Sequence, residues 1–96
     1  MKSTQAVPAL AALAHEGRLM IFRELVQAGP EGLPAGEVAR RMGVAASTMS
    51  ASLSVLAHAG LVTSRRDGRC IIYSAAYDRM AALLGFLMQD LSLIHI

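Results

Sequence analysis

The stretch VAASTMSASLSVLAH, residues 44–58, is rich in hydroxyl side chains and contains no Asp, Glu, Lys or Arg. Met49, Leu53 and Leu56 follow one another at the i, i+4 and i+7 spacing of a helix, so they should pack on a core. The hydroxyls must then largely lie elsewhere on the helix, and they belong to Ser47, Thr48, Ser50, Ser52 and Ser54. A hydroxyl can reach base edges or phosphates, although it selects less sharply than a bidentate Arg on guanine. A merely solvated face is the alternative interpretation.

Arginines on either side of this stretch supply the positive charge that it lacks. The segment 38–77 carries five arginines against one carboxylate, hence +4, in a chain of net charge +2; these residues are Arg40, Arg41, Arg65, Arg66, Arg69 and Asp67. Such a cluster favours contact with phosphates, which position a protein on a duplex. The alternative is a solubilising cluster in which Asp67 is a partial partner.

Periodicity and turn residues predict the elements that would position these groups. The pattern indicates helices near 4–14, at 34–42 and over the opening stretch, which Gly60 ends. A second helix directly follows the first and has Leu19, Phe22, Leu25 and Val26 on one face. Two β-compatible runs, LVTSRR and CIIYSA, are joined by Asp67-Gly68, a strong hairpin signal, and a fifth helix follows near 78–91. The predicted class is mainly α with a small β-hairpin (α+β), in the order helix, helix, helix, helix, strand, strand, helix. Two helices joined by a tight turn and followed by an Arg-bearing hairpin describe a winged helix-turn-helix.

The composition predicts a homodimer. The chain has 96 residues, of which 54% are hydrophobic and 17% charged, more apolar surface than a domain of this size can hide. The first and last predicted helices carry the excess as apolar stripes, which would bury either within one chain or, as we expect, between two chains. The candidate interface residues are Val7, Leu10, Leu13, Met80, Leu83, Leu84, Leu87 and Leu91.

One cysteine excludes an internal disulfide framework and suits a reducing, cytoplasmic location. We expect Cys70 to be a small buried strand residue rather than a redox or metal thiol. The start, MKSTQAVPALAALA, only faintly resembles a secretory signal, and nothing approaches the ~20 apolar residues of a membrane span. His15 and His58 have no second ligand candidate nearby in the sequence, so we expect no metal site and no cofactor.

The residues GEVARRMGVAASTMSASLSVLAHAGLVTSRRDGRCIIYSA, 36–75, resemble the ArsR/SmtB family of bacterial winged-helix repressors. The upstream LAALAHEGRLMIFRELV and the closing AALLGFLMQD fit the same pattern, so the resemblance covers roughly residues 9 to 90. It implies a homodimer that pairs through its first and last helices and reads an inverted repeat in double-stranded DNA. Matching to the family places five residues of the fourth helix nearest the bases: Ser47, Thr48, Ser50, Ala51 and Ser52.

The resemblance also implies an effector, often a metal or metalloid ion such as arsenite, that loosens the DNA complex. The family's Cys-x-Cys pair is replaced here by Pro34 and Gly36, and the last helix lacks the histidine of its zinc site. Members with a C-terminal cysteine pair continue past the acid at Asp90, where this chain has Leu91 and Ser92. The domain is therefore expected at 1–91. The tail 92–96 fits neither pattern, and a truncated or artificial end that has lost sensing residues is one interpretation of it.

Three classes of function compete for this sequence. A dimeric DNA-binding transcriptional repressor is the leading hypothesis. A winged helix that docks on proteins and uses its arginines for acidic partners is the alternative. No glycine elbow, phosphate loop or metal-ligand cluster frames the serines and histidines, so we do not expect an enzyme.

Overall fold

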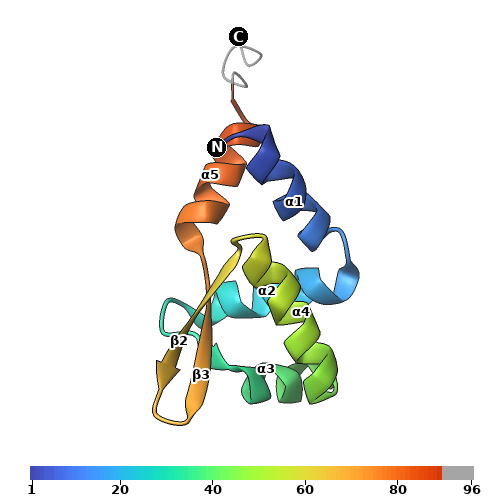
Figure 1. Ribbon diagram of the computed structural model, residues 1–96, viewed down its shortest axis with the longest axis vertical. Helices are drawn as coiled ribbons and strands as arrows, with labels where there is room; N and C mark the ends of the chain where they lie inside the picture. Colours follow the sequence, from blue (N-terminus) through green and yellow to red (C-terminus); the bar gives the residue numbers. More distant parts are fainter. Residues whose placement is uncertain (90–96) are drawn as a thin grey trace.

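The computed structural model describes residues 1–89 and shows helices at both ends of the chain with a small sheet and a helix-turn-helix between them (Figure 1). The elements are α1 (Ser3–Leu13), α2 (Glu16–Ala28), β1 (Leu33–Pro34), α3 (Ala35–Met42), α4 (Ala46–His58), β2 (Val62–Asp67), β3 (Cys70–Ala75) and α5 (Tyr77–Leu87). α1 and α5 lie together at one end of the molecule. The hairpin tip, α3 and the first turn of α4 lie at the other end.

The core forms where α2, α3 and α4 meet the sheet. Met49, Leu53 and Leu56 of α4 are fully buried, which confirms the predicted stripe. On α2 the stripe is displaced from the prediction: Ile21 lies inside with Phe22 and Leu25, and the other two predicted positions, Leu19 and Val26, are exposed. α2 contacts α1, α3, α4 and β3, and its buried residues belong to the common core.

A short turn holds α3 and α4 in a fixed relation. Gly43 adopts a left-handed conformation with φ of 67°, and its N–H donates to the Arg40 carbonyl at 3.3 Å. The N–H of Val44 donates to the Ala39 carbonyl at 3.1 Å. These bonds satisfy the carbonyls that end α3, as a glycine C-cap does. Pro34, which we placed inside this helix, is instead the residue before its first turn.

The hairpin β2–β3 is the predicted wing, and its register places Asp67 opposite Cys70. The two turn residues are therefore Gly68 and Arg69, one position later than the Asp-Gly motif suggested. Gly68 has φ of 63°, a positive value that suits the first central position of a two-residue turn. The sequence prediction missed β1, which pairs antiparallel with β3 and completes a sheet ordered β1-β3-β2. Two residues that include a proline show no strand periodicity, so only the pairing defines β1.

The two outer helices each bury one face and expose another. α1 packs inward through Ala6, Ala9 and Ala12, while Val7 and Leu10 are exposed. α5 ends at Leu87, one turn earlier than predicted, because Met88 is already its C-cap and has left the helical conformation. No helix within residues 1–89 is long and apolar enough to cross a membrane.

Candidate nucleic-acid interface

The uncharged face of α4 is open to solvent along its first three turns. Ser47, Thr48, Ser50, Ala51 and Ser54 are exposed, and Ser52 is half-buried. The side chains are short because they are Ser, Thr and Ala, so another molecule can approach the helix backbone closely. The N-terminal end of the helix also presents partial positive charge from its unpaired N–H groups. These six sequence-predicted residues lie along the first three turns of α4, a helix that begins at the end of the molecule that carries the wing (Figure 1).

The wing carries three arginines in two different settings. Arg65 Nη2 donates to the Glu31 carbonyl at 2.9 Å, which ties β2 to the loop between α2 and β1. Arg66 and Arg69 are exposed, and neither makes a side-chain hydrogen bond within the part of the chain that the structure describes. Arg65 and Arg66 are adjacent in the strand and therefore point to opposite faces. Arg66 and Arg69 are the wing cations that are available to a phosphate without breaking an internal contact.

Cys70 is exposed at the start of β3, so the prediction of a buried strand residue is wrong. Its strand partner is Asp67, at the end of the hairpin where the sheet has already left the core. Ile72, two residues further along, is the first residue of β3 that is buried. Strand residues near a hairpin tip are solvated on both faces, which sequence alternation alone does not reveal.

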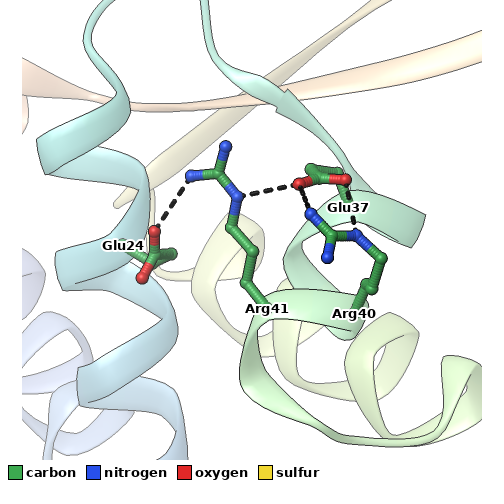
Figure 2. Close-up of polar contacts among 4 residues, drawn as sticks. All are labelled: Glu24, Glu37, Arg40 and Arg41. Carbon is green, nitrogen blue, oxygen red and sulfur yellow. Dashed lines mark hydrogen bonds and ion pairs between the residues drawn. The ribbon is translucent and has the colours of Figure 1, made fainter.

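Arg40 and Arg41 are held in an ion-pair network that the sequence prediction missed (Figure 2). Arg40 donates to the Glu37 carboxylate through Nε at 3.0 Å and through Nη2 at 2.5 Å. Arg41 donates through Nε to Glu37 Oε2 at 2.9 Å and through Nη1 to Glu24 Oε2 at 3.1 Å. Glu37 lies three and four residues before the two arginines, a spacing that could have indicated the pairing on α3.

This network joins α2 to α3 and partly neutralises the two arginines. Glu24 lies on α2, 17 residues from Arg41, so no local spacing could have paired them. The charge-assisted bonds fix the arginines beside the helix-turn-helix instead of leaving them free in solution. Their contact with phosphate, predicted from the sequence, therefore has to compete with two carboxylates.

The hydrogen bonds from Arg40, and next those from Arg41, lower the pKa of Glu37 from its ordinary value of 4.5 to about 2. A carboxylate whose folded-state pKa is depressed stabilises the fold above the unfolded pKa, and this contribution disappears as the pH falls toward the folded pKa. We expect the wild type to lose more free energy of unfolding between pH 4.5 and pH 2 than Glu37→Gln does. Urea denaturation at a series of pH values measures this difference. Glu31→Gln is the control, and equal pH slopes for the wild type and Glu37→Gln would contradict the pairing.

The histidines have local structural partners. His15 Nδ1 accepts from the Arg18 N–H at 3.2 Å and caps α2, and His58 Nδ1 lies 2.9 Å from the Ser54 carbonyl. Within residues 1–89 no three His, Cys, Asp or Glu side chains come together as a metal site would require.

Comparison with known proteins places this geometry in a family. Residues 13–65 match a family model described as a helix-turn-helix domain, from the end of α1 through α4 and into β2. The chain is 37% identical over 78 residues to the nodulation protein NolR of Rhizobium meliloti, covering 81% of this chain and 62% of that protein. It is 36% identical over 83 residues to the HTH-type transcriptional regulator YgaV of Escherichia coli strain K12, covering 86% and 82%.

Solved structures agree in fold as well as in sequence. An ArsR-like transcriptional regulator from Rhodococcus sp. RHA1 superposes with a TM-score of 0.82 at 27% identity, covering 96% of this chain and 84% of that one. The chain belongs to the ArsR/SmtB family of winged helix-turn-helix regulators. A second family structure, the homodimeric DNA-binding domain Mb0332 from Mycobacterium bovis, has a TM-score of 0.73 at 30% identity and covers 91% of this chain and 81% of that one.

Membership confirms the fold class predicted from the sequence and makes the chain a DNA-binding transcriptional regulator. In the family's terms α3 and α4 are the helix-turn-helix, α4 is the recognition helix and β2–β3 is the wing. The chain spans 62% of the length of NolR. The individual DNA-contacting residues remain predictions.

Proposed function

We propose that this ArsR-family regulator is a dimeric repressor that binds an inverted-repeat operator and is released by an effector. The observation that carries the proposal is the division of the surface. The exposed hydroxyl face of α4 and the wing arginines lie at one end, and the exposed apolar residues of α1 and α5 lie at the other. One end suits a nucleic acid and the other suits a second copy of the chain.

At the DNA-facing end the two kinds of residue divide the work. The recognition helix offers Ser47, Thr48 and Ser50 to base edges but has no fixed positive charge. Arg66 and Arg69 supply attraction to the phosphates on either side of the groove, because they have no internal partner among the described residues. Arg40 and Arg41 are proposed to contact the backbone only by giving up part of their bonding to Glu37.

Removal of one wing arginine tests this division. We expect Arg66→Ala and Arg69→Ala each to weaken binding to all duplex sequences alike and to reduce the slope of log affinity against log salt by about 1.8, which is about 0.9 for each of the two wings of the dimer. Fluorescence anisotropy with a labelled duplex at several salt concentrations measures the slope. Arg23→Ala on α2 removes the same charge from another surface and should leave the slope unchanged. An unchanged slope in both wing variants would exclude phosphate contact by the wing.

At the opposite end, exposed apolar side chains argue for a dimer. Val7 is 64% exposed on α1 and Leu87 is 52% exposed on α5, and Leu10, Leu84 and Met88 are exposed beside them. Water contact with such a patch is unfavourable, and a two-fold axis would bury it on both chains at once. Leu13 and Met80 are partly buried against their own core and can contribute only their outer surface.

The predicted interface also included Leu83 and Leu91. Leu83 is 2% exposed and belongs to its own chain's core, so its assignment to the dimer interface is wrong. Adjacent residues of a helix point about 100° apart. Leu83 therefore faces the core, and its neighbour Leu84 faces outward. Leu91 lies outside the described residues.

A charge placed on the apolar end should separate the dimer. We expect Leu87→Glu to raise the dimer dissociation constant at least about 100-fold, because a carboxylate would have to be buried without a partner. Sedimentation equilibrium measures the constant, and Met20→Glu, which changes an exposed apolar residue of α2, is the control. A monomeric wild type, or a Leu87→Glu protein as dimeric as the wild type, would contradict this interface.

The experiment that tests the proposed function is selection of DNA from a random-sequence duplex library, followed by footprinting and in vitro transcription. We expect a two-fold symmetric site that overlaps a promoter and reduced transcription when the site is occupied. No affinity for any duplex at low salt would instead favour a protein-interaction module.

A metal or metalloid ion is the effector class proposed from the family, and it would act in a longer form of the chain. Release of the selected DNA by arsenite or Zn²⁺ from this chain and from a longer form is the corresponding test.

A further inference from the structure

Arg79, in the first turn of α5, lies against the C-terminal end of α4. A Cβ atom built on Gly60 would lie 3.0 Å from both Cζ and Nη2 of Arg79, so the guanidinium would have to shift by a few tenths of an ångström. Gly60 also has φ of 79°, which other residues rarely adopt. The glycine that ends α4 therefore suits the backbone conformation and allows the close approach of the guanidinium.

Arg79 is half-buried as a residue, yet its guanidinium donates no hydrogen bond and joins no ion pair within residues 1–89. Four of the last five carbonyls of α4 already have partners. The Val55, Leu56 and Ala57 carbonyls take the N–H groups of the residues that follow the helix, and the Ser54 carbonyl contacts His58 Nδ1. The negative end of the α4 dipole favours a cation at this place without satisfying its donors.

Arg79 lines a hollow of about 410 Å³ between α1 and the end of α4. The other lining residues are Thr4, Gln5, Pro8, Ala57, His58, Ala59 and Gly60. None of them is acidic. The nearest carboxylate in the sequence, Asp78, lines an adjoining hollow and forms no ion pair with Arg79.

Three polar side chains of this hollow, those of Arg79, Thr4 and Gln5, carry hydrogen-bond donors. Because the Ser54 carbonyl can only accept, His58 Nδ1 carries the proton in that bond, and Nε2 of the neutral ring is then an acceptor. Gln5 Oε1 accepts from the Lys2 N–H at 3.0 Å, so the free group of its amide is the NH₂. Pro8, Ala57 and Ala59 supply apolar surface between these polar groups.

We propose that this hollow binds a small organic carboxylate, held by the guanidinium of Arg79. A guanidinium fork matches a carboxylate in two parallel hydrogen bonds, and Pro8, Ala57 and Ala59 can contact the apolar part of an organic anion. The hollow lies where α1 and α5, the proposed dimer helices, meet the end of the recognition helix. An occupant there is proposed to act as an effector that lowers DNA affinity, and this part alone rests on the proposed function.

The direct test is an NMR titration of the full chain with propionate, with propionamide and inorganic phosphate as matched probes. We expect saturable shifts of the Arg79 side-chain N–H and of the Gly60 amide with propionate, and weaker or no shifts with the other two. Arg79→Gln should weaken propionate binding at least about tenfold, while Arg23→Gln should not. Ala57→Glu, which adds a carboxylate to the lining at an exposed helix position, should also weaken it. Thermal melts establish that each variant is folded.

Failure of propionate to saturate, or equal binding by the wild type and Arg79→Gln, would overturn the site. Phosphate binding as tight as propionate binding would overturn its organic character. Anisotropy with the selected duplex then tests the effector role: propionate should weaken DNA binding by the wild type but not by Arg79→Gln. Propionate binding without any change in DNA affinity would overturn the role and keep the site. A chain that binds propionate but no DNA would instead count against the proposed function.

Discussion

Replacement of Ser50 by Glu is expected to lower the affinity for operator DNA at least about 30-fold, corresponding to about 2 kcal/mol. Ser50 is exposed and lies in the N-terminal half of α4. A carboxylate there would face the phosphates of both strands, and α4 has no Lys or Arg that could neutralise it. The side chain is exposed, so the free energy of unfolding should change little.

Ser50→Gln is the matched control for this variant, because it adds a side chain of the same length and shape without the charge. We expect it to retain non-specific binding and to change mainly the preferred sequence, since an amide can pair with base edges where a hydroxyl did so. Anisotropy with the selected duplex and with a random duplex measures both effects. Equal affinity of Ser50→Glu and wild-type protein for DNA would remove α4 from the interface.

The second large effect concerns stability. Leu53→Ala is expected to lower the free energy of unfolding by about 2–5 kcal/mol, because it empties a fully buried position. Leu53 is 0% exposed and lies in the middle of the α4 stripe, between Met49 and Leu56. Domains of this size have only about 5–15 kcal/mol of net stability, so the variant should be partly unfolded at growth temperature and should lose DNA binding as a consequence.

Val55→Ala on the same helix is the control, since Val55 is 41% exposed. We expect it to cost less than about 1 kcal/mol, because the side chain is exposed and its truncation leaves no cavity in the core. Urea denaturation followed by circular dichroism measures both variants. Similar losses for the two would show that the stripe on α4 does not face the core.

Glu37 and Arg41 show where sequence interpretation of the candidate site succeeds and where it stops. The pairing of Glu37 with Arg40 and Arg41 follows a three- and four-residue spacing on one helix, so it could have been predicted. The further bond from Arg41 to Glu24 depends on how α2 packs against α3, which no local pattern contains. The sequence therefore identified the cations near the helix-turn-helix but not the carboxylates that hold them.

By itself the sequence determined the recognition helix, the wing hairpin and the apolar character of the outer helices, because each depends on a local period or a turn residue. The helical spacing of Met49, Leu53 and Leu56 predicts a buried stripe, which the structure contains. Gly68 supplies the positive φ that the turn needs. Only the tertiary structure decided which face of each outer element meets the core. In the folded protein Leu83 is buried and Cys70 is exposed. The burial of these two residues depends on packing between residues far apart in the chain, which no local pattern contains.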